Sequence, residues 1–219
     1  MSVSNSQAAR RAYHHGDLRR ALLNAGLALA REGGPEAVVL REATRRAGVV
    51  PNAAYRHFAS RDALLHAVRA AALATLATVM GQEVALIPAD LPKDDAARRH
   101  LRAVGTAYLR FALTETGLFR TAFGVPVAPM PAPDPAMADA AGLNPFQHLG
   151  AALDRMVAAG VLPQERRSGA EYLAWSAVHG MAMLVIEGPM HVMDRTLVDV
   201  LSRRLLLMVE TGLSGPVHR

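Results

Sequence analysis

A short stretch of the chain carries side chains that can hydrogen-bond to the edges of nucleic-acid bases. Arg56 can donate two bonds to guanine, and Asn52 can pair with adenine. Ala53, next to Asn52, is small enough to let a helix approach a groove closely. These three residues are therefore candidates for contacts that depend on the base sequence.

Donors suited to phosphate oxygens surround that stretch. Tyr55, His57 and Arg61 lie near the end of the same predicted helix, where the phosphates of a bound duplex would run. Such contacts position a protein on DNA without reading its sequence. The segment before the stretch adds further candidates, which are Arg41, Thr44, Arg45 and Arg46.

These side chains need a scaffold, and residues 40–58 predict a helix-turn-helix. A short helix over 40–47 has apolar residues on one face and is followed by Gly48, a typical residue after a helix C-terminus. Pro51, a favoured first helical residue, opens a second short helix that is expected to end near Phe58, a core residue. The second helix of such a pair can lie in the major groove while the first crosses the backbone.

The charge distribution favours the same region. The chain has 24 basic and 19 acidic residues, and residues 1–66 hold ten arginines, no lysine and five acidic residues. The remaining residues therefore carry fourteen charges of each sign, so the whole excess of +5 lies in the first third. A basic segment beside a neutral one suggests a polyanionic partner, although a solvated arginine-rich face would give the same count.

Beyond this region the pattern is helical throughout and predicts an all-α fold. The expected helices span about residues 17–31, 61–80, 94–114, 145–160, 168–187 and 195–212, with a joint near Gly81 and 87–92. Their expected capping residues are Asp17, Ser60, Asn144, Ser168 with Glu171, and Asp194. Five prolines within 124–135 predict a loop, either a lid or a plain connector. Strand patterns and internal repeats are not evident.

Composition limits the class of protein. The chain lacks cysteine, which excludes disulfides and thiolate zinc sites and fits a reducing cytoplasm. No uncharged apolar run is long enough to cross a bilayer, and the polar N-terminus does not predict a secretion signal. Histidines are not spaced as metal ligands, and nucleophile or phosphate-loop motifs are missing, so we expect no metal, no cofactor and no enzyme.

Several blocks of residues resemble the tetracycline-repressor (TetR-type) family of transcriptional regulators. The similarity is dense over 13–66, in the blocks Tyr13-His14-His15-Gly16-Asp17-Leu18, Leu40-Arg41-Glu42-Ala43, Arg46-Ala47-Gly48-Val49 and Tyr55-Arg56-His57-Phe58. The resemblance implies a three-helix DNA-binding head, a linking helix, and a helical C-terminal domain for ligand binding and dimerisation. It also implies that Tyr55 and His57 contact phosphates, with Arg61 as a further candidate.

The resemblance sets expected domain boundaries and shows two departures. We expect a basic flexible arm over 1–13, a head over 14–66 whose linking helix continues to about 80, and a ligand-binding and dimerisation domain over 82–219. The family usually has Ser or Thr at the positions of Val39 and Val50. Valine cannot accept the capping hydrogen bond, and losing a cap costs on the order of 1 kcal/mol.

The C-terminal half resembles one subgroup of the family. The block Trp175-Ser176-Ala177-Val178-His179-Gly180 is similar to a Trp-His-Gly (WHG) motif of that subgroup. His179 is a candidate ligand contact or, on the simpler interpretation, a buried histidine with a hydrogen-bonding partner. The methionines near it suit either an adaptable apolar pocket, ordinary core or a dimer face. The candidate ligand residues are Phe111, Phe123, Met156, Trp175, His179 and Met183.

The function expected from these observations is a cytoplasmic, ligand-responsive repressor. It would bind a palindromic operator in double-stranded DNA as a homodimer, and a small apolar molecule would release it. Apolar residues on more than one face of the last two predicted helices favour pairing with a second copy into a four-helix bundle. The alternatives are a DNA-binding regulator without a ligand and an enzyme, for which no catalytic constellation is present.

Overall fold

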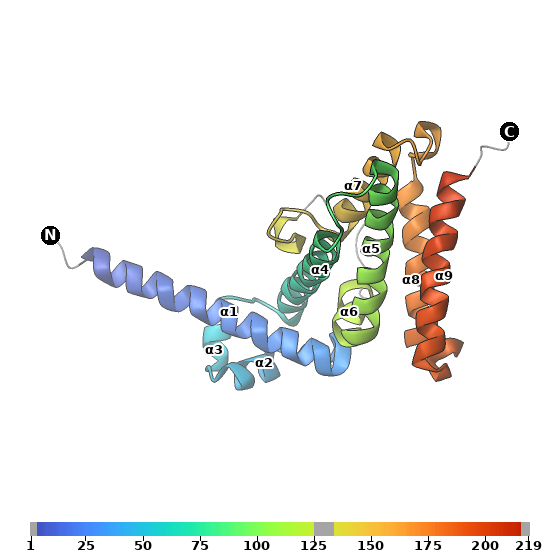
Figure 1. Cartoon of the computed structure of the whole chain (residues 1–219). Coiled ribbons are helices and arrows are strands. Elements are labelled where there is room, and N and C mark those ends of the chain that lie inside the picture. The colour runs from blue at the N-terminus through green and yellow to red at the C-terminus, as the bar shows by residue number, and fades with distance from the viewer. Residues whose placement is uncertain (1–3, 125–133, 216–219) are drawn as a thin grey trace. The chain divides into compact units, whose positions relative to one another are not determined.

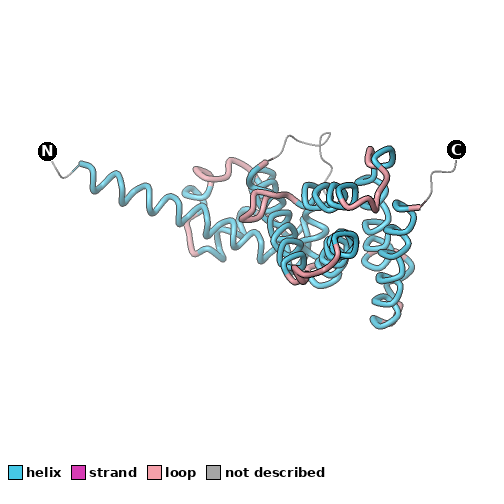
Figure 2. Tube along the Cα trace, turned by 45° about the horizontal axis from the view of Figure 1, so that its top comes forward, coloured by secondary structure: helices cyan, strands magenta, loops and turns pink. Residues whose placement is uncertain are grey.

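The computed structural model describes residues 4–124 and 134–215, with side chains from residue 18 onward except that of Pro51. Throughout the described ranges the chain forms helices joined by turns and has no strand, as Figure 2 shows. The all-α prediction is therefore confirmed. The chain divides into two compact units that share helix α4 (Figure 1). Most of the proline-rich segment lies outside the described residues.

The N-terminal unit, called the head below, combines residues up to 72 with a later segment that starts at Gly117. It contains α1 (Ser4–Ala37), α2 (Leu40–Ala47), α3 (Pro51–Ala54), the first half of α4 (Arg61–Ala85), and α6 (Thr116–Phe123). Its core is apolar and includes residues from each of these helices, with Ala54 of α3 and Phe58 just beyond that helix both buried. The largest buried side chains are those of Leu22, Val38, Phe58, Leu64, Val68, Leu118 and Phe119.

Helix α1 differs from its prediction at its start. Its backbone is helical from Ser4, so the expected arm over 1–13 is helical from that residue on, and Asp17 lies inside the helix rather than at its cap. The predicted stop is confirmed, because Gly33 and Gly34 leave helical geometry ahead of Pro35. Leu22 and Leu29 of this helix are buried in the head.

The helix-turn-helix segment agrees closely with its prediction. Helix α2 has the predicted bounds and buries Leu40, Ala43 and Thr44. Gly48 adopts a left-handed conformation with φ of 66°, which glycine reaches without the steric cost that a Cβ adds. The following helix is shorter than predicted, since α3 ends at Ala54 and a turn leads to Phe58.

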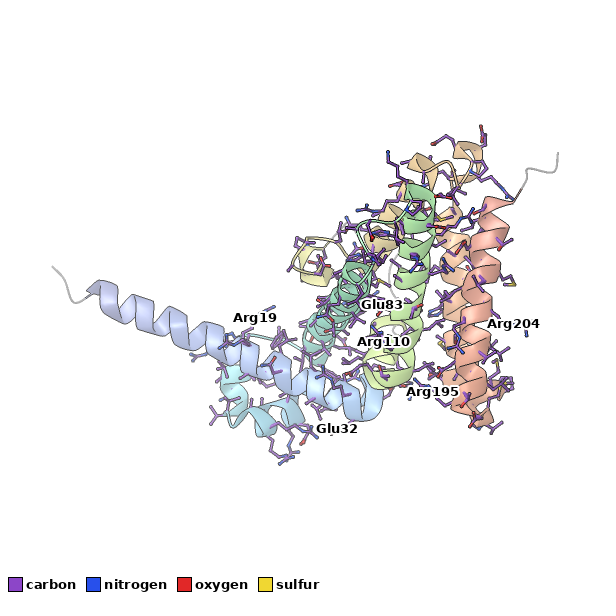
Figure 3. All side chains as sticks on the ribbon, viewed as in Figure 1. Arg19, Glu32, Glu83, Arg110, Arg195 and Arg204 are labelled. Atoms are coloured by element: carbon purple, nitrogen blue, oxygen red, sulfur yellow. The ribbon has the colours of Figure 1, made fainter. Side chains whose placement is uncertain are left out.

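The C-terminal unit holds the second half of α4 with α5 (Lys93–Thr114), α7 (Pro145–Ala158), α8 (Ala170–Ile186) and α9 (Arg195–Ser214). Short 3-10 turns at Pro135–Met137, Gln164–Arg166 and Pro189–Val192 connect them. In addition to apolar contacts, ion pairs join these helices. Arg110 of α5 contacts Glu83 of α4 at 2.7 Å (Figure 3), and the buried carboxylate of Glu210 on α9 contacts Arg98 of α5 at 3.1 Å.

The predicted capping residues are confirmed at three helices. Ser60 accepts from the Ala63 N–H, and Asp194 accepts from the Thr196 N–H. Asn144 forms a complete capping box with Gln147, in which each side chain accepts from the other residue's backbone N–H at 2.9 Å.

One predicted cap is wrong. Gly169, in a left-handed conformation, precedes α8, and no side chain caps that helix. Ser168 therefore does not have the predicted role, and Glu171 pairs with Arg167 at 2.6 Å instead.

Helix α4 continues through the joint expected at Gly81 and ends at Ala85. A Cβ at position 81 would lie 3.1 Å from an oxygen of Asp139, which is hydrogen-bonded to Nε2 of His148 on α7 at 2.7 Å. Glycine here allows the helix to pass close to that buried pair. By length and hydropathy alone α4 could span a membrane, but half of its most apolar window is buried inside the described structure, as in the core helix of a globular domain.

Helices α8 and α9 lie side by side (Figure 1). Both leave large apolar side chains exposed. Within a single chain, α8 buries Ala170, Ala174, Val178 and Ala182 on one face, although its apolar residues occupy more than one face. The exposed apolar side chains on the two helices are those of Tyr172, Leu173, Leu184, Leu197, Val200, Leu207 and Met208.

Candidate functional site

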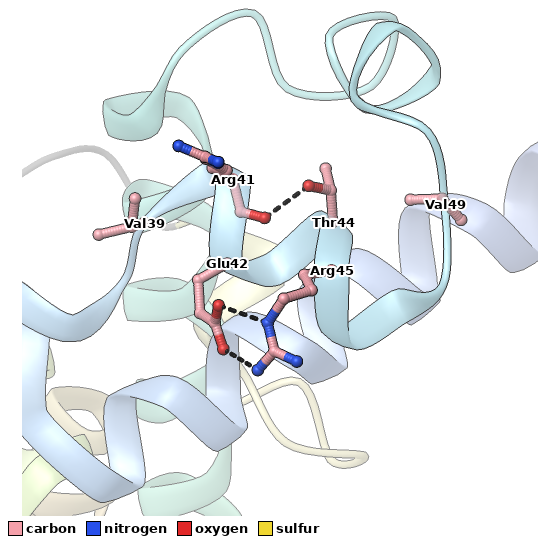
Figure 4. A pocket seen from close by; sticks show the side chains of 6 residues that line it. All are labelled: Val39, Arg41, Glu42, Thr44, Arg45 and Val49. Carbon is pink, nitrogen blue, oxygen red and sulfur yellow. Dashed lines mark hydrogen bonds and ion pairs between the residues drawn. The ribbon is translucent and has the colours of Figure 1, made fainter.

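The candidate base-contacting residues lie on the open side of the helix-turn-helix. Asn52 and Arg56 are exposed and Ala53 is partly exposed. They follow the Gly48 turn on and just beyond α3, whose short length places Arg56 in the succeeding turn rather than on a helix. Figure 4 shows the turn and the preceding helix α2. An exposed amide and an exposed guanidinium at this place can both reach base edges.

The candidate phosphate contacts occupy several environments. Tyr55 is 56% exposed, and Arg41 and Arg45 are exposed on α2. His57 is half-buried at the end of the turn. This group offers a phenol, an imidazole and two guanidinium groups to an incoming phosphate backbone.

Two predicted DNA contacts make hydrogen bonds inside the head. Arg61 donates from Nε to the Val38 carbonyl at 2.9 Å and from Nη2 to the Pro35 carbonyl at 2.8 Å. These bonds tie the start of α4 to the connection before α2. The hydroxyl of Thr44, a residue only 3% exposed, donates to the Arg41 carbonyl at 2.6 Å and so helps to shape α2.

The two valines at the helix starts are exposed, and Val39 does not cap. Val39 stands at the N-cap of α2 with φ of −115° and ψ of 127°, and no side chain caps that helix. It is 43% exposed and Val50 is 68% exposed. Valine therefore presents methyl groups where a hydroxyl would bond to the backbone N–H groups of the first turn.

A second candidate site, in the C-terminal unit, is a hydrogen-bonded cluster of three ring side chains. The hydroxyl of Tyr108 on α5 lies 2.7 Å from Nδ1 of His179 on α8. Trp175, one turn before His179, donates from Nε1 to the same hydroxyl at 3.1 Å. Phe146 of α7 packs against the Trp175 ring with centroids 6.2 Å apart. The prediction that His179 has a hydrogen-bonding partner is confirmed.

Burial sets the protonation of this cluster. It raises the pKa of Tyr108 above the ordinary tyrosine value, and it lowers the pKa of His179 below the ordinary histidine value. A phenol that stays protonated beside a neutral imidazole donates to it. The proton order is then Trp175 N–H to Tyr108 oxygen, and Tyr108 O–H to Nδ1 of His179.

The other predicted ligand residues fall into two groups. Phe111 and Met156 are fully buried in the core of the C-terminal unit, while Trp175, His179 and Met183 are half-buried. Phe123 belongs to the head, where its ring lies 4.9 Å from that of Phe119. In the described part of the chain, no group of three or more His, Asp or Glu side chains could hold a metal ion.

Two functional candidates were missed from the sequence. Tyr108 lies within an ordinary amphipathic pattern, and only its pairing with Trp175 and His179 distinguishes it. Glu42 was treated as part of a family motif, yet it pairs with two arginines of the candidate DNA-binding surface. The spacing of Glu42 to Arg45 and Arg46, three and four residues along a helix, was the available signal.

Comparison with known proteins gives consistent results for both halves of the chain. Residues 22–68 match the model for bacterial regulatory proteins of the tetR family, and residues 101–209 match a tetracyclin repressor-like C-terminal domain. A comparison with curated proteins found no match.

Two solved structures resemble the chain over most of its length. A Rhodococcus sp. RHA1 protein of unknown function is 27% identical, with 93% of this chain and 98% of that one covered and a TM-score of 0.72. A TetR transcriptional regulator from Streptomyces coelicolor is 23% identical, with 91% and 99% covered and a TM-score of 0.44.

The helix-turn-helix head and the helical C-terminal unit define a DNA-binding transcription regulator and not an enzyme. The chain belongs to the TetR family. The WHG subgroup and the individual DNA and ligand contacts remain predictions.

Proposed function

We propose that the protein is a cytoplasmic repressor that binds a palindromic operator as a homodimer and releases it when a small apolar molecule binds the C-terminal unit. The observation that carries the DNA-binding part is the exposure of Asn52, Tyr55 and Arg56 directly after the Gly48 turn. Exposed Arg41 and Arg45 on α2 add positive charge beside them.

Dimerisation is supported by the apolar faces of α8 and α9. A single chain leaves Leu184, Leu207 and Met208 between 44% and 62% exposed. Pairing with the same helices of a second copy would bury these side chains in a four-helix bundle. A two-fold axis through that bundle would relate two heads, which suits half-sites about one helical turn apart.

Ligand binding is supported by the cluster of Tyr108, Trp175 and His179. A half-buried indole and imidazole with fixed hydrogen-bond directions, flanked by Phe146 and Met183, suit an apolar molecule with one polar group. To act, the ligand must bind the DNA-free state more tightly than the DNA-bound state. We infer that it favours a separation of the two heads that does not match adjacent grooves.

Binding to the DNA upstream of the protein's own gene and of its divergent neighbour tests the first part. Labelled duplexes are titrated at low salt against an equal-length duplex of scrambled sequence, and footprinting then maps the protected bases. We expect a protected palindrome and a clear preference over the scrambled duplex. Equal affinity for both duplexes at all salt concentrations would contradict operator recognition.

Trp175 offers a direct test of ligand binding because it is the chain's only tryptophan. We expect apolar aromatic compounds that release the operator to change its emission with the same concentration dependence. If no compound in a broad apolar panel changes the emission or the DNA affinity, the regulator works without such a ligand, which is the alternative function.

A further inference from the structure

Glu42 is an acidic residue within the basic surface formed by α2. Its carboxylate accepts two hydrogen bonds from Arg45, from Nε at 2.9 Å and from Nη2 at 2.7 Å. It also accepts from Nε of Arg46 at 3.0 Å. These bonds lower the pKa of Glu42 to about 2, so that it is ionised at neutral pH. The two-pronged contact with Arg45 is the geometry in which a guanidinium binds a phosphate.

Arg46 holds this arrangement against α1. Its Nη1 and Nη2 each contact one oxygen of Glu32 at 2.7 Å, while its Nε bonds to Glu42. Arg46 therefore bridges two carboxylates and is committed to joining α1 and α2. Arg45 is different, because its side chain is 72% exposed and Glu42 is its ion-pair partner on the outer side of the helix.

The pair faces a hollow of about 600 Å³ on the surface of α2, shown in Figure 4. The hollow is lined by Val39, Arg41, Glu42, Thr44, Arg45 and Val49. The charged groups around the hollow are the guanidinium groups of Arg41 and Arg45 and the carboxylate of Glu42. The hydroxyl of Thr44 donates to the Arg41 carbonyl. A phosphate that approached Arg45 here would have to compete with the carboxylate of Glu42 for Nε and Nη2 of its guanidinium.

We propose that Glu42 is an internal substitute for a DNA phosphate, which occupies Arg45 in the free protein and must be displaced when a duplex binds. This inference rests on the proposed binding of DNA by the head. Non-specific binding depends on phosphate contacts, whereas the operator adds base contacts from Asn52 and Arg56. Every duplex presents phosphates to Arg45, so the cost of displacing Glu42 weakens binding to operator and scrambled sequences alike. Glu42 thereby limits the phosphate contribution to affinity and leaves base recognition unchanged.

The test substitutes Glu42→Gln, which keeps the length of the side chain and an acceptor oxygen but removes the negative charge. Affinity for the operator and for a scrambled duplex is measured between 50 and 200 mM salt. One additional phosphate contact makes the slope of log K against log salt steeper by about 0.9. We expect this steeper slope on both duplexes, several-fold tighter binding to each at low salt, and an unchanged operator preference.

Glu32→Gln is the matched control, because it changes the net charge equally and breaks an ion pair of the same Arg46 but leaves Glu42 on Arg45. It should keep the wild-type slope. If Glu32→Gln produces the same steepening, the effect is one of overall charge and the proposal is overturned. Thermal unfolding followed by circular dichroism shows whether each variant keeps its helices.

Adding Arg45→Gln to Glu42→Gln should abolish the gain in non-specific binding, because Arg45 makes the additional contact. A gain that persists in the double variant would also overturn the proposal. Failure of the wild-type protein to prefer any duplex would contradict the proposed function instead. A wild-type protein that prefers its operator, together with a Glu42→Gln variant that is indistinguishable from it, would contradict only the role of Glu42.

Discussion

The exposed side chains after the Gly48 turn differ in the kind of recognition that each can perform. A phenol donates one bond to any phosphate, while an amide and a guanidinium can match the donor and acceptor pattern of particular base pairs. Substitution of Tyr55 should therefore have a different signature from substitution of Asn52 or Arg56.

We expect Tyr55→Ala to weaken binding to operator and scrambled duplexes by the same factor. Asn52→Ala or Arg56→Ala should change the preference between operator variants, by about 1–3 kcal/mol at the base pair concerned. Titrations against single-base operator variants measure both effects. Arg99→Ala, which removes an exposed arginine in the C-terminal unit, should change neither property. Unchanged affinity of Tyr55→Ala for both duplexes would exclude the assigned phosphate contact.

His179 gives the stability of the fold a dependence on pH. Burial lowers its pKa in the folded chain, so the unfolded chain takes up a proton at a higher pH than the folded chain does. The free energy of unfolding should therefore be unaffected by this group above its ordinary value of about 6.5, and should fall as the pH decreases from there toward the folded-state pKa.

Urea unfolding at pH 7.5 and 5.5 checks this expectation. The wild-type protein should lose more stability on acidification than His179→Gln does, because glutamine does not titrate. His66→Gln, at an exposed histidine of α4, should retain the wild-type pH dependence. Identical losses in the wild-type protein and in His179→Gln would show that the cluster with Tyr108 does not favour the neutral imidazole.

At the scale of single helices, the caps illustrate what local sequence determines. Asn144 stabilises the start of α7 through its capping box, whereas Val39 leaves α2 without a side-chain cap in an extended backbone conformation that suits one. Val39→Thr should therefore raise the free energy of unfolding by up to about 1 kcal/mol, and Asn144→Ala should lower it by a similar amount.

Chemical denaturation of the two variants measures this pair of effects. Val192→Thr is the control for exchanging an exposed valine, because Val192 is 77% exposed and is not a helix N-cap, a position that Asp194 holds for the following α9. It should leave the free energy of unfolding nearly unchanged. A Val39→Thr variant no more stable than Val192→Thr would mean that the new hydroxyl does not reach the first turn of α2.

The sequence predicted the elements that depend on local signals. The turn at Gly48 and the caps at Ser60, Asn144 and Asp194 all follow from residue types at fixed offsets. One departure came from tertiary contacts instead. A glycine at position 81 normally weakens a helix by up to about 1 kcal/mol, but packing against the buried Asp139–His148 pair keeps α4 continuous there.

The candidate site shows the same division between features set by local sequence and features set by tertiary contacts. Residue type and order were enough to propose Asn52, Tyr55 and Arg56 as DNA contacts, since these lie close together in the sequence, and all three are exposed in the fold. Tyr108 could not be paired with His179 without the fold, because their contact joins α5 to α8 across 71 positions in the chain. Likewise, only the fold shows that Arg61 bonds to the backbone before α2.

For the whole molecule, the apolar faces of α8 and α9 make assembly the main expectation. Replacing Leu184 and Leu207 together by Glu would place charges in the proposed four-helix bundle, where burial of an unpaired carboxylate is costly. We expect this variant to be a monomer in light scattering coupled to size-exclusion chromatography. Its operator affinity should fall by orders of magnitude, while weak non-specific binding by each head persists.

Leu86→Glu is the matched control, because Leu86 is 76% exposed but lies after α4, away from α8 and α9 in the sequence. That variant should assemble and bind the operator as the wild-type protein does. A double variant on α8 and α9 that remained a dimer would show that another surface joins the two copies.

The membership of α6 in the head has a consequence for how such regulators can exchange parts. A Cβ at Gly117 would lie 2.2 Å from the Ala30 carbonyl oxygen, and Arg69 donates to the Ala122 carbonyl at 2.9 Å. The head is thus completed by a segment encoded after α5. A single genetic crossover near residue 72 would transfer a head without Leu118 and Phe119 in its core. A working hybrid must carry α6 together with the α1 against which it packs. The DNA-binding and C-terminal units of this protein therefore cannot be exchanged between relatives by one crossover, although the head begins the chain.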